Sequence, residues 1–192
     1  TFFIMNIVLL TPMDIEQQKV QKALQKAVKL KNNYNVIVSG IGRESTAKTM
    51  MSLPEHDLCI LLGFGAVIGQ ENVLPKELKL GKPVEITACS LYGYQGELFE
   101  NGRLIVENAK TNLPCLTSLT SDKFVKTTHL TTGTIVNMED YTFMYLKKPQ
   151  DFIIRIVSDF LPHATEIDFF KEIEQISFEE AIKAIEEANF QL

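Results

Sequence analysis

Three acidic residues are the side chains of this sequence best placed to carry out chemistry. Glu16 begins a predicted helix after the first strand, Glu139 begins another helix, and Asp159 follows a buried strand. In an open α/β sheet, residues just past the carboxyl ends of the strands converge on one crevice. Three carboxylates there, with Phe124 and Met138 as apolar contacts, suit a reaction that builds positive charge on a sugar. Taken singly, each acid is explained equally well by a place at a helix end.

Motifs for other kinds of catalysis are absent from the sequence. The three histidines are scattered, and neither HExxH nor GxSxG occurs. The segment from Gly63 to Gly69 lacks the GxGxxG spacing of a dinucleotide-binding loop, and residues 40–48 lack the Gly-Lys-Ser/Thr of a P-loop. We interpret the glycines as a sharp turn at the end of a strand, and we expect no metal or cofactor.

The elements that must position the acids alternate regularly in the first third of the chain. Strands are predicted at residues 2–10, 34–38 and 58–62, with helices at 12–31 and 45–53 between them. This β-α-β-α-β order, with strands that are apolar on both faces, predicts a mainly parallel sheet covered by helices.

The rest of the chain departs from this alternation. The Asn101-Gly102 pair is a tight-turn signal and predicts a hairpin within residues 84–106. The remaining predicted elements are short strands at 113–117 and 134–136, a helix at 139–146, a buried strand at 152–157 and two amphipathic helices, the second from Ser177, with a capping box, to about Asn189. We therefore predict one domain over residues 1–192 with a three-layer α/β/α fold around a mixed, mainly parallel central sheet.

Composition and charge exclude several classes of protein. The 192 residues are 45% hydrophobic and 22% charged, and the net charge of -5 disfavours binding to nucleic acid. Apolar runs stop near ten residues, short of the roughly 20 that a membrane-spanning helix needs. Cys59, Cys89 and Cys115 lie far apart in apolar stretches, which is typical of reduced, buried thiols. We expect a soluble cytoplasmic protein without nucleic-acid or membrane partners.

Seven short segments, spread in order over most of the chain, resemble one known family. They are Asn6–Glu16, Ser39–Gly42, Asp57–Val67, Leu78–Gly81, Ser121–Val125, Val136–Glu139 and Arg155–Asp159. Together they resemble the nucleoside phosphorylase superfamily and, within it, the methylthioadenosine/S-adenosylhomocysteine nucleosidases. The resemblance implies the fold of that superfamily and cleavage of the N-glycosidic bond of a purine nucleoside. It also implies a homo-oligomer, most simply a dimer, for which Tyr92–Phe99 offers exposed aromatic residues.

The resemblance also implies a role for each of the three acids. Glu16 matches the acid that orients or deprotonates the attacking water. Glu139 matches the acid that binds the 2′ and 3′ hydroxyls of the ribose, and Asp159 matches the acid that protonates or hydrogen-bonds the leaving purine at N7. These roles agree with physical expectation, because a purine leaves more easily when it is protonated and carboxylates stabilise a positively charged sugar.

Further substrate-binding residues follow from the same resemblance. Met138 matches the residue under the sugar, and Phe124 with the backbone of Val125 matches the purine-binding segment. Gly63, in the glycine-rich segment, and Arg43, beside a predicted loop, are candidates to cradle an anion through backbone N–H groups and a guanidinium.

Departures from the family leave alternatives open. Phe64 replaces a small hydroxyl residue, Asn137 replaces the first acid of a Glu-Met-Glu motif, and Leu61 and Leu62 stand where phosphorylases carry a phosphate-binding Arg. The retained Glu16 and the missing Arg slightly favour hydrolysis over phosphorolysis, in which phosphate would be a co-substrate, in purine or methylthioadenosine salvage. The alternative, motivated by Phe64 and Asn137, is a nucleoside-binding protein of the same fold without catalysis.

Overall fold

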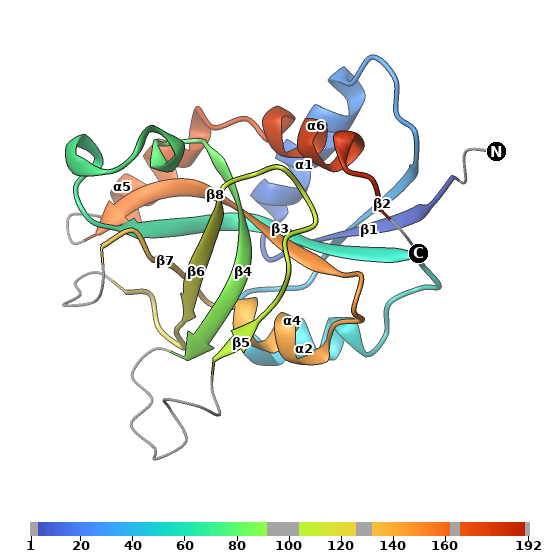
Figure 1. Cartoon of the computed structure of the whole chain (residues 1–192), viewed down its shortest axis with the longest axis horizontal. Coiled ribbons are helices and arrows are strands. Elements are labelled where there is room, and N and C mark those ends of the chain that lie inside the picture. The colour runs from blue at the N-terminus through green and yellow to red at the C-terminus, as the bar shows by residue number, and fades with distance from the viewer. Residues whose placement is uncertain (1–3, 92–103, 126–131, 162–165, 191–192) are drawn as a thin grey trace.

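The first half of the sheet forms as the apolar pattern predicts. The computed structural model describes residues 4–91, 104–125, 132–161 and 166–190. Strands β1 (Asn6–Thr11), β2 (Asn33–Val38) and β3 (Leu58–Ile68) alternate with helices α1 (Asp14–Lys26) and α2 (Arg43–Met50). Strand β1 pairs in parallel with both β2 and β3, which confirms the predicted β-α-β-α-β start (Figure 1).

Strand β3 continues through the glycine-rich segment, so the sharp turn predicted at Gly63 is wrong. Gly63 and Gly65 lie inside the strand, and the backbone reaches a positive φ, of 128°, only at Gly69. A Cβ on Gly63 would lie 2.8 Å from Arg155 Nη1 and from Glu16 Oε1. Gly63 therefore permits close approach of two charged side chains to the strand rather than a change of chain direction.

The second half of the chain adds strands that are mostly short. They are β4 (Pro83–Leu91), β5 (Ile105–Val106), β6 (Cys115–Thr120), β7 (Ile135–Asn137) and β8 (Phe152–Leu161), with single 3₁₀ turns at Glu71–Val73 and Lys76–Leu78. β4 and β5 pair antiparallel, as a hairpin requires, but the Asn101-Gly102 turn and the aromatic segment Tyr92–Phe99 lie outside the described residues. β8 extends four residues beyond its predicted end, so the placement of Asp159 after that strand is wrong: it lies within the strand.

Five strands close into a ring at one end of the sheet. β3 pairs with β8, β8 with β4, β4 with β6, β6 with β7, and β7 returns to β3. β1 and β2 extend the sheet outward from β3 (Figure 1). Five of the eight strand pairings are parallel, which confirms a mixed, mainly parallel sheet.

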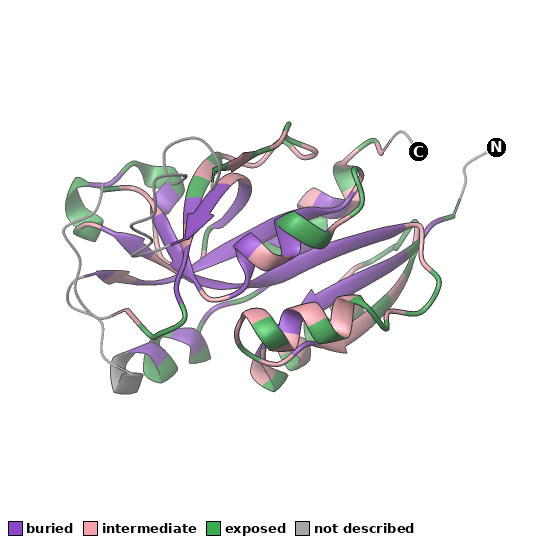
Figure 2. Ribbon diagram, turned by 90° about the horizontal axis from the view of Figure 1, so that it is seen from below, coloured by how far each residue is buried: buried purple, intermediate pink, exposed green. Residues whose placement is uncertain are grey.

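Helices cover both faces of the sheet and complete the predicted three layers. Successive side chains of β1 point to opposite faces, so Ile7 and Leu9 join one core and Val8 and Leu10 the other. Helices α1, α5 (Glu166–Glu174) and α6 (Glu179–Glu187) pack on the first core, and α2 and α4 (Asp140–Leu146) on the second. The purple strands in Figure 2 show how completely these layers bury the centre of the sheet.

Several element ends differ from the predicted ones. Helix α1 stops at Lys26 because Ala27 is extended, and the last helix begins at Glu179, where Ser177 Oγ accepts a hydrogen bond from the Glu179 N–H instead of forming the predicted capping box. The three cysteines are free, but Cys115 is exposed rather than buried, because it lies on the outward side of β6. No helix in the described ranges has the length and apolar character to cross a bilayer.

Candidate active site

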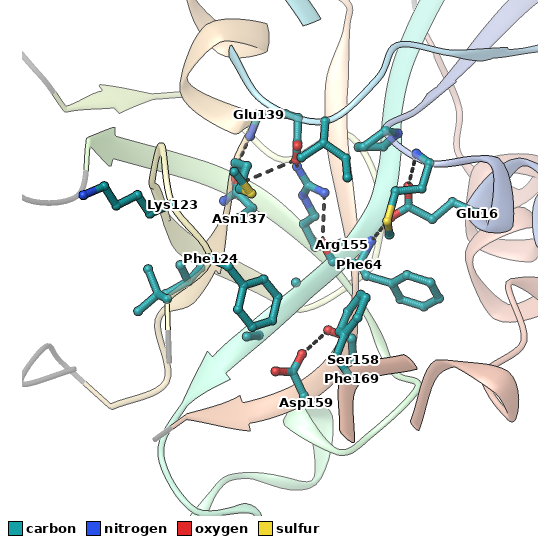
Figure 3. Close-up of a pocket in the computed structure, with 18 of the residues that line it drawn as sticks. Glu16, Phe64, Lys123, Phe124, Asn137, Glu139, Arg155, Ser158, Asp159 and Phe169 are labelled. Atoms are coloured by element: carbon teal, nitrogen blue, oxygen red, sulfur yellow. Dashed lines mark hydrogen bonds and ion pairs between the residues drawn. The ribbon is translucent and has the colours of Figure 1, made fainter. Parts of the chain in front are cut away.

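A cavity of about 310 Å³ opens where β3, β7 and β8 meet the loops before α2 and α4 (Figure 3). Six of the eight residues selected from the sequence line it, namely Glu16, Phe124, Val125, Met138, Glu139 and Asp159. The structure thus brings the three predicted acids to the wall of one cavity, although they come from α1, the start of α4 and β8.

The other two selected residues do not line the cavity. Arg43 forms an exposed ion pair in which Nε and Nη2 donate to the two carboxylate oxygens of Asp122, at 2.7 and 3.1 Å. Gly63 lies behind the wall, packed against Glu16 and Arg155. Anion binding by Arg43 or Gly63 remains a prediction.

Arg155, which was not selected from the sequence, is the centre of the polar network. It is 1% exposed, and its Nε donates to Asp140 Oδ1 at 2.8 Å, its Nη2 to Glu139 Oε2 at 2.9 Å and its Nη1 to the Phe64 carbonyl at 2.9 Å. Burial alone would lower the pKa of Arg155, but Asp140 and Glu139 together raise it above its ordinary value. The signal for Arg155 was present, because a single charge within the apolar run of residues 152–157 needs a buried partner.

Glu16 is held by two backbone groups beside this network. Its Oε2 accepts a hydrogen bond from Met13 N at 2.7 Å, and its Oε1 accepts one from Phe64 N at 2.8 Å (Figure 3). Burial raises the pKa of Glu16 to about 8, against the opposing effects of the Phe64 N–H and Arg155. A carboxyl group that titrates near neutral pH is suited to take a proton from water.

Glu139 presents its carboxylate to the cavity from the start of α4. Its Oε1 accepts from Gly42 N at 2.9 Å, and its Oε2 accepts from Arg155 Nη2 at 2.9 Å and from Met138 N at 3.3 Å. The residue is only 3% exposed, so these three donors fix the carboxylate firmly. Oε1 has a further lone pair for a ligand hydroxyl, whereas a hydroxyl that reaches Oε2 would have to share that oxygen with the Met138 N–H.

Asp159 is aimed by an irregularity in β8. The register with β3 pairs Val157 with Gly65 and then Asp159 with Ala66, so Ser158 is the extra residue of a bulge. Ser158 Oγ donates to Asp159 Oδ1, and Asp159 Oδ2 is buried without a hydrogen-bond partner among the described residues. Burial raises the pKa of Asp159, while Ser158 opposes the shift. The free oxygen can therefore carry a proton for a ligand.

Aromatic rings form the apolar part of the wall. Phe124 and Phe64 each meet Phe169 edge to face, at centroid distances of 6.0 and 6.1 Å. The Phe64 ring also packs on Phe178 at 5.1 Å, so it points into the core beneath α5 and α6. Replacing a small residue by Phe64 thus leaves the backbone N–H that binds Glu16 in place. Phe169, Ser158 and Lys123 also line the cavity but were not selected from the sequence.

Metal-binding clusters are not found in the described ranges. No group of three or more His, Cys, Asp or Glu side chains within residues 4–91, 104–125, 132–161 and 166–190 could hold a metal ion. The chemistry of the described cavity rests on carboxylates, one guanidinium and aromatic rings.

The strand order, the five-stranded ring and the acid-lined cavity define an α/β protein with the nucleoside phosphorylase fold. Similar solved structures include the 5′-methylthioadenosine/S-adenosyl homocysteine nucleosidase of Helicobacter pylori, with 15% identity, a TM-score of 0.73 and coverage of 95% of this chain and 96% of that one. The S-adenosylhomocysteine nucleosidase of Streptococcus pyogenes has 17% identity, a TM-score of 0.73 and coverages of 97% and 98%. A futalosine hydrolase mutant of H. pylori has 14% identity, a TM-score of 0.72 and coverage of 95% of this chain and 97% of that one. These likenesses confirm the predicted fold. No family model and no curated protein sequence matches the chain.

Proposed function

We propose that the chain is a purine nucleosidase, which hydrolyses the N-glycosidic bond in purine or methylthioadenosine salvage. The observation that carries this proposal is the convergence of Glu16, Glu139 and Asp159 on one cavity, two of them with raised pKa values. The neighbours described above include nucleosidases of methylthioadenosine and S-adenosylhomocysteine, and a futalosine hydrolase.

Each acid has a defined task in the proposed reaction. Asp159 donates its proton to purine N7, so the protonated base takes the electron pair of the breaking C1′–N9 bond and leaves as neutral purine. Glu139 holds the ribose hydroxyls, and the carboxylates stabilise the positive charge that develops on the sugar. Glu16 accepts a proton as the water oxygen bonds to C1′, which yields the free sugar and the free purine.

Water suits this cavity better than phosphate as the nucleophile. Arg155 already donates to Asp140, Glu139 and Phe64, and Arg43 is paired with Asp122 outside the cavity. Among the described residues that line the cavity, only Lys123 adds a second cation. A phosphate dianion would face several carboxylates there with little compensating positive charge.

Base release from nucleosides tests this function directly. Purified protein is incubated with methylthioadenosine, adenosine, inosine and guanosine, with and without phosphate, and free base is quantified by chromatography. We expect release without phosphate, and the same release when phosphate is added. Release only with phosphate would make the chain a phosphorylase. Binding without release from any of the four would favour the non-catalytic alternative.

Substitution of Glu139 tests whether this acid belongs to the site. Glu139→Gln replaces a charged acceptor of two hydroxyls by an amide that turns a donor toward one of them, and it weakens the partner of Arg155. We expect a higher KM and slower turnover. Wild-type kinetics in this variant would remove Glu139 from the site.

A further inference from the structure

Two uncharged side chains, Asn137 and Thr120, hold the start of helix α4. The residues are partners in the parallel pairing of β7 with β6. Asn137 Oδ1 accepts three hydrogen bonds, from Thr120 Oγ1 at 3.1 Å, from Glu139 N at 3.0 Å and from Asp140 N at 2.8 Å. Thr120 Oγ1 in turn accepts from Tyr141 N at 2.8 Å.

These two side chains satisfy three consecutive backbone donors that the helix cannot satisfy itself. The N–H groups of the first turn have no partner within a helix, and leaving them unpaired in the interior is costly. Thr120 and Asn137 are 1% and 6% exposed, so solvent is a poor substitute. Because Glu139 and Asp140 are the two direct carboxylate partners of Arg155, the position of the central ion network depends on these hydrogen bonds.

The absence of charge on Asn137 matters in this position. The network already contains Glu16, Glu139 and Asp140 around a single guanidinium. An amide oxygen caps the backbone of Glu139 without adding a fourth carboxylate, while its Nδ2 donates to the Leu119 carbonyl at 3.4 Å. Like charges in a buried site would oppose one another strongly.

We propose that Asn137 and Thr120 are positioning residues, which set the Glu139 carboxylate at the distance and angle needed for the sugar hydroxyls of the substrate. This rests on the proposed function, because Glu139 is assigned there to the ribose. A residue that merely capped α4 would affect stability alone. A positioning residue affects recognition of the sugar and leaves recognition of the base unchanged, since the base is assigned to Phe124, Val125 and Asp159, which line the cavity.

The test compares Asn137→Ala, Thr120→Val and Thr120→Ser with Thr117→Val, the same substitution on the exposed side of the same strand. We measure kcat/KM for methylthioadenosine and the Kd of free adenine by calorimetry. Asn137→Ala should lower kcat/KM about tenfold, which corresponds to about 1.4 kcal/mol of lost transition-state stabilisation, and leave the adenine Kd within about twofold. Thr120→Val should act in the same direction, Thr120→Ser should restore most of the activity, and Thr117→Val should match the wild type.

Other outcomes overturn the proposal in separable ways. Unchanged kcat/KM in Asn137→Ala, equal losses for nucleoside and adenine, or no recovery in Thr120→Ser would each contradict it. Base release from no nucleoside by the wild-type chain would instead refute the proposed function. Amide hydrogen exchange tests the hydrogen bonds on which the proposal rests independently of activity: unchanged protection at the Glu139 and Asp140 amides of Asn137→Ala overturns it.

Discussion

The Arg155 guanidinium hydrogen-bonds to two of the buried carboxylates in the site but not to Glu16. Arg155 bonds to Glu139 and Asp140, whereas Glu16 binds only backbone N–H groups. Burial therefore dominates at Glu16 and raises its pKa to about 8. Below that pH the free site stores a proton on Glu16, and above it the carboxylate is available as a base.

The rate of cleavage should report this titration. Since Glu16 must be ionised to accept a proton from water and Asp159 must be protonated to donate one, we expect a bell-shaped pH profile of kcat/KM with one limb near pH 8. The measurement is a pH profile with methylthioadenosine. Glu16→Gln should lose most activity and show no limb near pH 8. A wild-type profile without a limb near pH 8 would show that Glu16 is not the base.

Asp159 is the residue whose substitution separates acid catalysis from a structural role. Asp159→Asn keeps the side-chain shape and its partner Ser158 but removes the proton. General acid catalysis contributes about 10²- to 10⁴-fold, so cleavage of methylthioadenosine should fall by that order. A nitrophenyl riboside, whose leaving group needs no protonation, should lose much less. Equal slowing of both substrates would assign Asp159 a structural role only.

The sequence predicts the acids that line the cavity better than the residues that hold those acids in place. Glu16, Glu139 and Asp159 stand out only as a set, because acids beside the predicted strands of an open α/β sheet are expected to converge on one crevice. Arg155 is visible as a lone charge in an apolar run and Asn137 as a departure from a motif, but their roles in the site depend on which strands become neighbours. Arg155 donates to the carbonyl of Phe64, 91 residues earlier, and Asn137 accepts from Thr120, 17 residues earlier. No local sequence pattern predicts contacts over such separations.

At the scale of elements, the site depends on how closely β3 and β8 approach α1. β8 supplies Arg155 and Asp159, and its bulge at Ser158 sets the direction of the second. β3 supplies the Phe64 backbone. It also carries Gly63 at the position where a side chain would clash with Arg155 and Glu16. The apolar runs of β3 and β8 predict buried strands but do not reveal these irregularities.

Gly63→Ala tests the close approach. Its Cβ would meet Arg155 Nη1 and Glu16 Oε1 at 2.8 Å and Pro12 Cδ at 3.1 Å. Because Arg155 cannot move without stretching its ion pairs, we expect a loss of about 1–3 kcal/mol in the free energy of unfolding and weaker activity. Urea denaturation and kinetics at a temperature where the variant is folded measure both. A variant with wild-type stability and rate would show that the cluster adapts freely.

The order of the first three strands is predictable from local pattern, whereas the pairing of the later strands is not. Helices between long apolar strands force β1, β2 and β3 into a parallel order. The later elements also form near their predicted positions, with β7 close to 134–136 and α4 close to 139–146, but the closure of the ring is a property of five strands together.

On the scale of the whole molecule, the mouth of the cavity is apolar. Ile41, Phe124 and Phe170 line the cavity and are 53%, 37% and 55% exposed. Exposed apolar groups around the mouth of a site favour coverage by another surface, which would also keep bulk solvent out. A second copy of this chain would provide that coverage, in line with the dimer expected from the sequence.

We therefore predict a homodimer whose formation improves catalysis. Light scattering at micromolar concentration should give twice the mass of the chain, and specific activity should fall on dilution through the dissociation range. Ile41→Asp, on the exposed rim, should weaken association. A monomer with full activity would contradict this prediction.

The ring of strands also sets the order in which the site is built during synthesis. Its β3–β8 contact joins residues 58–68 to residues 152–161, so most of the chain must leave the ribosome before the ring closes. Contacts so distant in sequence form slowly. Arg155 arrives only with β8, and until then Glu16 and Glu139 have no cation between them. The cavity therefore cannot form before β8 is synthesised, even where β1, β2 and β3 have already paired.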